Sequence, residues 1–209
     1  MTLSQELWND HQEIARRCLN HPFVTGIASG QLDLEKFKFY IGQDAFFLEA
    51  FARAYSITAA KAPDWTGFNE LHQLAGAVLT ELNLHKQLAA EWGVTLDKVQ
   101  PSPATRRYTD FLLATAWGQE TGLTTVAMSP CMRLYAFLGQ EIAKQGVKDH
   151  QYTSWVQTYS SDEFEQFAQT LESLVNRYAA ATLPTRETYR YALYCEEAFF
   201  SAAWEVVDS

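Results

Sequence analysis

The sequence has 209 residues, of which 47% are hydrophobic, and it carries 16 Lys and Arg against 25 Asp and Glu, a formal net charge of −9. This composition supports one compact domain over residues 1–209 and excludes intrinsic disorder, while the acidic balance argues against a nucleic-acid partner, because clustered Lys and Arg neutralise phosphates. The sequence contains no run of about 18 apolar residues, the length that a membrane-spanning helix needs, and the three cysteines form no C-x-x-C pair. We therefore expect a cytoplasmic protein without disulfides or membrane contact.

Helical periodicity runs through the whole chain and predicts about eight helices and no strand. Asp33 and Asp64 are placed to cap two long helices, and Ser102 followed by Pro103 begins another. No linker, repeat or change of composition divides the chain. The fold class is therefore an all-α bundle in a single domain, with expected helices over about 34–61, 65–92, from 103 onward, and over 123–145, 151–159, 161–182 and 185–206.

The first long helix carries a carboxylate on an aromatic face. Asp44 follows the 3–4 spacing of apolar residues, namely Phe37, Tyr40, Ile41, Phe47, Leu48, Phe51 and Tyr55. We therefore expect Asp44 to point inward, although an ionised group is costly to bury without partners. It is either a structural acid that a tyrosine or backbone donor satisfies, or a group that binds a ligand.

The run over 123–145 carries Cys131 on the same face as Tyr135. Pro130 has no backbone N–H, so we expect the helix to break or kink there and Cys131 to lie near the first turn of a new segment. The positive end of a helix dipole favours a thiolate, so the pKa of Cys131 is expected to be lowered. The alternative is a buried cysteine that acts as a small hydrophobe.

In the last helix Glu196 interrupts an apolar stripe that includes Leu193 and Phe199, while Glu197 is turned about 100° away toward solvent. Two inward carboxylates and a thiol on three different helices are more than a core usually tolerates. Apolar surroundings would raise the pKa of Glu196 and suit it to acid–base work. Asp44 could then hold N–H groups of a ligand.

Other kinds of site find little support. The sequence contains no G-x-G-x-x-G, G-x-x-x-x-G-K-[ST], G-x-S-x-G or H-E-x-x-H motif, and none of the Glu-x-x-His pairs that di-iron bundles use. Glu81 and His85 could form a carboxylate–imidazole pair on one helix, which we interpret as structural or solvated. We therefore expect no metal site.

Several segments carry a resemblance that spans nearly the whole chain. They include HPFVTGIASGQL (21–32), FKFYIGQDAFFLEAFARAY (37–55), SPCMRLYAFLG (129–139) and YCEEAFFSAAW (194–204). Together these motifs resemble the TenA (thiaminase II) family, the aminopyrimidine aminohydrolases of thiamin salvage. The resemblance implies a heme-oxygenase-like helical bundle, usually a homotetramer, that needs no metal or organic cofactor.

The resemblance also implies a reaction and a set of roles. The substrate would be a small-molecule aminopyrimidine, 4-amino-5-aminomethyl-2-methylpyrimidine, hydrolysed to its hydroxymethyl counterpart. Cys131 would be the nucleophile, which adds to the ring, and Glu196 the acid or base. The substrate-binding residues would be Asp44 and Tyr135 at the ring edge and an aromatic wall of Tyr108, Tyr159, Phe47 and Phe199.

Two positions depart from the family pattern, and two other functions are alternatives. Phe47 stands where many members have Tyr, and Phe200 where Trp is common, so we expect the rate and substrate preference to shift and the reaction type to remain. A metal-dependent oxidase on the same scaffold is opposed by the missing Glu-x-x-His pairs. A non-catalytic regulatory protein would need a DNA-contacting surface or a protein partner. The charge of −9 opposes direct DNA binding, and an intact catalytic set would be hard to explain in a protein that only binds.

Overall fold

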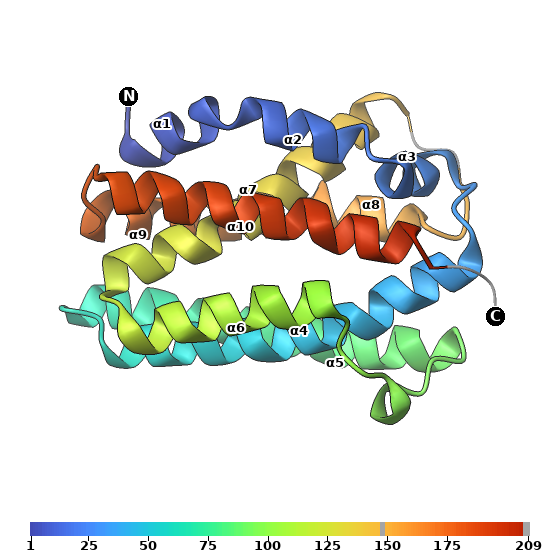
Figure 1. The fold of residues 1–209 in the computed structure, drawn as a ribbon, viewed down its shortest axis with the longest axis horizontal. Helices are drawn as coiled ribbons and strands as arrows, with labels where there is room; N and C mark the ends of the chain where they lie inside the picture. Colours follow the sequence, from blue (N-terminus) through green and yellow to red (C-terminus); the bar gives the residue numbers. More distant parts are fainter. Residues whose placement is uncertain (147–148, 207–209) are drawn as a thin grey trace.

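The computed structural model describes residues 1–146 and 149–206, without the side chains of residues 84, 85, 87, 88, 91 and 97. Ten α-helices and one 3₁₀ helix occur in this part of the chain. The described residues contain no strand, so the all-α prediction is confirmed (Figure 1). The helices exceed the expected eight because residues 1–32 form three short ones. In chain order they are α1 (Leu3–Asp10), α2 (Gln12–Leu19), α3 (Pro22–Ser29), α4 (Leu34–Ala60), α5 (Trp65–Glu91), η1 (Leu96–Lys98), α6 (Pro103–Gly118), α7 (Thr121–Lys144), α8 (Thr153–Tyr159), α9 (Asp162–Tyr178) and α10 (Leu183–Trp204).

The helix starts that the sequence predicts are confirmed at three positions. Asp33 accepts a hydrogen bond from the backbone nitrogen of Glu35 at 2.8 Å and so caps α4. Asp64 accepts one from the nitrogen of Gly67 at 2.8 Å at the start of α5, and Ser102 caps α6. Each side chain satisfies a backbone N–H that has no partner within its own helix, which explains where these helices begin.

The expected break at Pro130 is wrong. Pro130 lies inside α7, which continues from Thr121 to Lys144. A proline inside a helix loses one backbone hydrogen bond and costs about 3 kcal/mol. Because α7 packs on α4, α6, α8, α9 and α10, burial along its length outweighs that local cost. Cys131 is therefore in the middle of a helix, beyond the reach of the terminal dipole.

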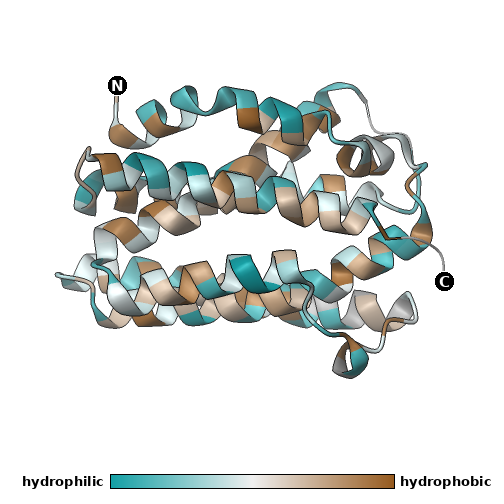
Figure 2. Ribbon diagram, in the orientation of Figure 1, coloured by the Kyte–Doolittle hydropathy of each residue, from teal (hydrophilic) through white to brown (hydrophobic). Residues whose placement is uncertain are grey.

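The helices form two groups with a common core between them. α4 packs along α5 and α6, whereas α7 packs along α8, α9 and α10. In Figure 1 the first group lies in the lower half of the molecule, and α1 and α2 run along the top. Hydrophobic and hydrophilic residues alternate along the helices (Figure 2). Because α4 also contacts α7 and α10, the inward faces of the two groups meet in one core.

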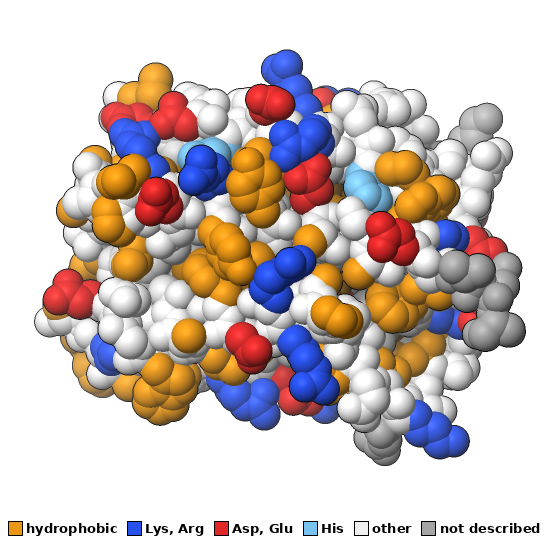
Figure 3. Space-filling model, in the orientation of Figure 1, with side chains coloured by type: hydrophobic (Ala, Val, Ile, Leu, Met, Phe, Trp, Pro, Cys, Tyr) orange, Lys and Arg blue, Asp and Glu red, His pale blue; other side chains and the backbone are white. Residues whose placement is uncertain are grey.

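The surface carries both charge and exposed aromatic side chains. On the face in Figure 3, hydrophobic patches lie between acidic and basic residues. Trp65 and Trp117 are the most exposed aromatic side chains among the described residues, each with 73% of its surface accessible. No described helix combines the length and the apolarity that crossing a membrane requires.

Candidate active site

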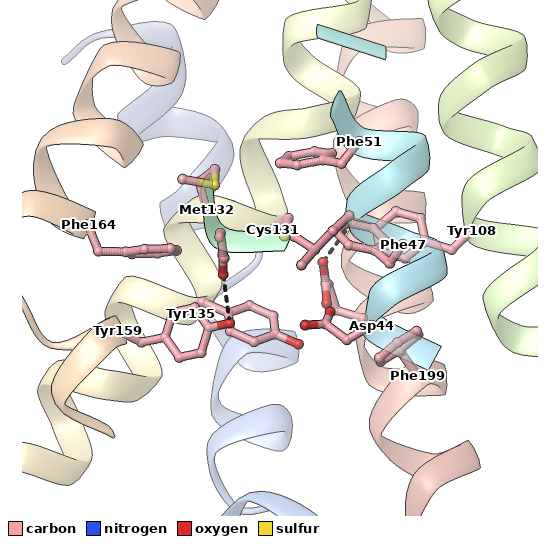
Figure 4. Close-up of a pocket in the computed structure, with 13 residues that line it drawn as sticks. Asp44, Phe47, Phe51, Tyr108, Cys131, Met132, Tyr135, Tyr159, Phe164 and Phe199 are labelled. Atoms are coloured by element: carbon pink, nitrogen blue, oxygen red, sulfur yellow. Dashed lines mark hydrogen bonds between the residues drawn. The ribbon is translucent and has the colours of Figure 1, made fainter. Parts of the chain in front are cut away.

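A cavity with about 400 Å³ of empty space lies where the two groups of helices meet, and we call it the inner cavity. The helices from α4 to α10 all contribute to its wall. The fold brings together here the eight residues that the sequence and the resemblance selected, Asp44, Phe47, Tyr108, Cys131, Tyr135, Tyr159, Glu196 and Phe199 (Figure 4).

Glu196 lies at the centre of a hydrogen-bonded group. The hydroxyl of Tyr108 donates to Oε1 of Glu196 at 2.7 Å, and the thiol of Cys131 lies close to the same carboxyl group. Burial raises the pKa of Glu196 to about 7, and the charge of Asp44 acts in the same direction. The hydrogen bond from Tyr108 and the interaction with Cys131 lower this pKa but do not outweigh burial. Glu196 therefore changes its charge near neutral pH, as acid–base work requires.

Cys131 departs from the expectation of a lowered pKa. Its pKa lies well above the usual value, first because the thiol is buried, and then because the charges of Glu196 and Asp44 oppose a thiolate. The sequence argument failed because it placed Cys131 at a helix start and could not locate these two carboxylates. In the resting protein Cys131 is a neutral thiol beside a carboxyl group that can take its proton.

Burial also raises the pKa of the other two cysteines. For Cys195 the pKa is raised to about 12, and for Cys18 it is raised further. Neither cysteine lines the inner cavity. Both are buried, as structural cysteines usually are.

A chain of hydrogen bonds sets the direction of the Tyr135 hydroxyl. The indole nitrogen of Trp155 donates to the hydroxyl of Tyr40 at 3.3 Å, and Tyr40 donates to the hydroxyl of Tyr135 at 3.1 Å. Because an indole N–H can only donate, Tyr40 must accept from Trp155 and can pass its own proton to Tyr135. The proton of Tyr135 is then left to point toward another acceptor, and Tyr135 lines the inner cavity.

Aromatic rings form two opposite sides of the cavity. Figure 4 shows Phe47, Tyr108 and Phe199 on one side, Tyr159 and Phe164 on the other, and Cys131 between them. The ring centres of Phe47 and Tyr108 are 4.8 Å apart. Walls of this kind suit a flat aromatic ligand, because ring faces stack favourably on one another.

Glu81 is a third carboxylate in the cavity wall, and we did not predict it as a site residue. The hydroxyl of Tyr159 donates to Oε1 of Glu81 at 3.2 Å (Figure 4). We had considered Glu81 only as a partner of His85, whose side chain lies outside the described residues. A signal was present, since Glu81 follows Leu74 and Val78 at helical spacing on a buried stripe of α5.

Glu197 is not simply solvated, as the sequence had suggested. It accepts hydrogen bonds from Nε and Nη2 of Arg17 in α2, at 2.7 and 2.8 Å, and it is half-buried. This ion pair lowers the pKa of Glu197. The two residues are far apart in the sequence, so periodicity could not reveal the pair.

The described residues contain no group of three or more His, Cys, Asp or Glu side chains arranged to hold a metal ion. The thiol and the carboxyl groups described above are thus the chemically active groups that the inner cavity presents.

Comparison with known proteins relates the chain to one family. A family model described as TENA/THI-4/PQQC family matches residues 8–205. The chain is 33% identical to the bifunctional TH2 protein, mitochondrial, of Arabidopsis thaliana over 96% of its own length, and it spans 37% of the length of that relative. It is 30% identical to the aminopyrimidine aminohydrolase of Halalkalibacterium halodurans, over 86% of this chain and 83% of that protein.

Solved structures support the same relationship. The fold is similar to that of a TenA homologue protein from P. horikoshii OT3, with a TM-score of 0.90, 29% identity and coverage of 98% of this chain and 99% of that one. It is also similar to a domain with a heme oxygenase-like fold from Shewanella denitrificans OS217, with a TM-score of 0.74, 12% identity and coverage of 97% and 90%. The chain thus has a heme-oxygenase-like helical fold.

Proposed function

The chain belongs to the TENA/THI-4/PQQC family, and we propose that it is an aminopyrimidine aminohydrolase that converts 4-amino-5-aminomethyl-2-methylpyrimidine to the hydroxymethyl compound and ammonia. The observation that carries the proposal is the thiol of Cys131 beside the carboxyl group of Glu196, whose pKa burial raises to about 7, inside an aromatic cavity. The similarity to an aminopyrimidine aminohydrolase adds support.

The cavity wall supplies the groups that would bind this substrate. The flat pyrimidine ring stacks between aromatic side chains such as Phe47 and Tyr159. At its edge, Asp44 accepts hydrogen bonds from the ring amino group. Tyr135 donates to a ring nitrogen, because its hydroxyl already accepts a hydrogen bond from Tyr40. The ring is therefore oriented before reaction begins.

Cys131 and Glu196 carry the reaction itself. Glu196 takes the thiol proton as the sulfur adds to an electron-poor ring carbon, which disrupts the aromatic system. Electrons from the ring then expel the amine from the C5 methylene group, and the amine keeps both electrons of the broken C–N bond. Water adds its oxygen at the methylene and gives its proton to the released amine, the sulfur departs and regains its proton from Glu196, and the ring becomes aromatic again. A thiol, a carboxyl group and water account for every bond made and broken, so the proposal needs no metal or organic cofactor.

The test is incubation of the pure protein with the aminomethyl compound and, separately, with thiamin, following ammonia, thiazole and hydroxymethylpyrimidine. We expect turnover of both, with the aminomethyl compound preferred, and activity that persists after chelation. No turnover of either compound would overturn the proposal. Stoichiometric iron with oxygen consumption would favour an oxidase instead.

We also propose a cytoplasmic location and a homo-oligomer. The three cysteines are free thiols, which suits a reducing compartment. Exposed aromatic residues such as Trp65 and Trp117 could be covered by further copies of the chain. For a homotetramer, light scattering of the eluted protein should give four times the chain mass of 23.7 kDa.

A further inference from the structure

A second cavity, which we call the outer cavity, adjoins the inner one. It has about 780 Å³ of empty space including its mouth, and α4, α5, α7, α8 and α9 contribute to its wall. Three residues line both cavities, namely Glu81, Met132 and Phe164. These three side chains therefore mark the junction between the two spaces.

The junction connects the inner cavity with the more exposed outer one. The described residues that line the inner cavity are all buried, except Glu81, which is half-buried. The outer cavity, in contrast, has the exposed residues Thr80, Thr158 and Glu163 in its wall. A group that extends from the inner cavity into the outer one therefore passes Glu81.

The charge along this route is of one sign. Asp44, Glu81 and Glu196 line the inner cavity, and Glu163 lines the outer one. No Lys, Arg or His occurs among the described residues that line either cavity. Carboxylates in a partly desolvated space attract a cation much more strongly than they would in water. The Tyr159 hydroxyl, which donates to Glu81 at 3.2 Å, holds this carboxylate at the junction.

We infer that the outer cavity is the subsite for the leaving group and that Glu81 selects a cationic amine there. The inference rests on the proposed function. The aminomethyl group is a primary amine and is protonated at neutral pH. Asp44 and Tyr135 engage the ring edge, and the ammonium group projects toward the junction, where Glu81 is the carboxylate that lines both cavities.

This placement has consequences for substrate range and for product release. Amines with a larger substituent on nitrogen extend into the outer cavity and remain substrates, whereas the inner cavity alone would reject them. When the C–N bond breaks, the amine nitrogen takes both electrons and leaves as a neutral amine. The pyrimidine product then carries a hydroxyl in place of the ammonium group, so Glu81 no longer holds it by charge.

The first test uses two ligands that differ mainly in this charge, the aminomethyl compound and its hydroxymethyl product. Their Kd values are measured by calorimetry in a Cys131→Ala background, where no turnover occurs. Glu81→Gln should weaken binding of the cationic ligand by about 10- to 100-fold, the worth of a hydrogen bond to a charged group, and leave the Kd of the neutral ligand nearly unchanged. Glu49→Gln, at a glutamate that lines neither cavity, is the matched control and should affect neither Kd.

The second test fills the outer cavity. Ala77, in α5, lines the outer cavity only. Ala77→Trp should lower kcat/KM for an N-propyl derivative of the aminomethyl compound at least tenfold more than kcat/KM for the aminomethyl compound itself. Gly76→Trp is the control, because a side chain at this exposed neighbour meets no atom within 4 Å at its Cβ. It should leave the ratio between the two substrates as in the parent.

The outcomes separate this inference from the proposed function. If Glu81→Gln weakens both ligands equally, or if Ala77→Trp affects both substrates equally, the subsite is overturned while the hydrolase proposal stands. If the parent protein turns over neither amine, the hydrolase proposal fails, and the subsite fails with it. Unchanged binding of the hydroxymethyl compound also shows that each variant is folded.

Discussion

Glu196 and Glu197 are neighbours in the chain with different surroundings. Glu196 is only 2% exposed and meets Tyr108 and Cys131 in the inner cavity. Glu197 lies on another face of α10 and pairs with Arg17. The rotation of about 100° between successive helix residues thus separates an acid–base group from a structural ion pair.

This difference predicts unequal effects of the same substitution. We expect Glu196→Gln to lower kcat by about 10²–10⁴-fold, the typical contribution of a positioned acid or base. Glu197→Gln weakens only a partly exposed ion pair with Arg17 and should change kcat by less than about threefold. Steady-state kinetics on the aminomethyl compound compare the two variants. Equal losses would contradict the role of Glu196.

The thiol of Cys131 predicts how activity depends on pH. Because Cys131 is protonated in the resting protein, the first step needs Glu196 as a carboxylate, and the pKa of Glu196 is about 7. We therefore expect kcat/KM to rise as the pH increases through about 7, the pKa of the base in the free enzyme. Rates measured from pH 5.5 to 9 check this. A profile that is flat from pH 6 to 8 would speak against proton transfer to Glu196.

At the scale of helices, glycines let backbones touch and so place the cavity wall. A Cβ at Gly139 of α7 would meet the end of α8, including the backbone of Tyr159 and the nitrogen of Ser160 at 2.6 Å. A Cβ at Gly122, at the start of α7, would instead meet the backbone of Tyr178 at the end of α9. The contact at Gly139 supports Tyr159, which lines the inner cavity, whereas Tyr178 does not line this cavity.

These two glycines form a matched pair for substitution. Gly139→Ala should push α8 away, misplace Tyr159, and raise KM several-fold, while overpacking lowers the free energy of unfolding by about 1–3 kcal/mol. Gly122→Ala should cost comparable stability and leave KM near that of the parent. Urea titration and kinetics on both variants are the measurements. A parental KM for a destabilised Gly139→Ala variant would mean that this contact does not position the site.

At the scale of the whole molecule, folding buries titratable groups in the centre of the bundle. Asp44, Cys131 and Glu196 are at most 8% exposed. For Glu196 the pKa rises from 4.5, its ordinary value, to about 7 on folding. The folded protein therefore holds this proton more tightly than the unfolded chain does. The group thus favours the folded state at low pH, and this benefit is lost as the pH rises through about 7.

A stability measurement follows from that shift. For Glu196 alone, the free energy of unfolding should fall by about 3 kcal/mol between pH 4.5 and pH 8, at about 1.4 kcal/mol for each unit of pKa. Glu196→Gln removes this dependence, so the variant should lose less stability over the same interval and be the more stable protein at pH 8. Urea titrations at pH 5, 6.5 and 8 compare them. Parallel pH curves for the two proteins would contradict a raised pKa.

The parts of this protein that the sequence alone predicts depend on neighbours along the chain. Asp33 caps α4 because its side chain reaches N–H groups two and three residues ahead. Asp44, Cys131 and Glu196 could be selected because helical periodicity tells which face a residue lies on. The all-α class follows from the same periodicity repeated over the chain.

Only the tertiary structure decides features that depend on residues far apart in the sequence. Local chemistry at Pro130 predicts a break, but packing against α4, α6, α8, α9 and α10 keeps α7 continuous. The pKa of Cys131 is raised by burial and by the charges of carboxylates from α4 and α10. No local sequence pattern reveals that these carboxylates lie next to Cys131. Glu81 becomes a site residue only because α5 reaches the cavity beside α8. Electrostatic energies depend on distance and burial in space, and for that reason the sequence predicts which groups matter better than it predicts how they are charged.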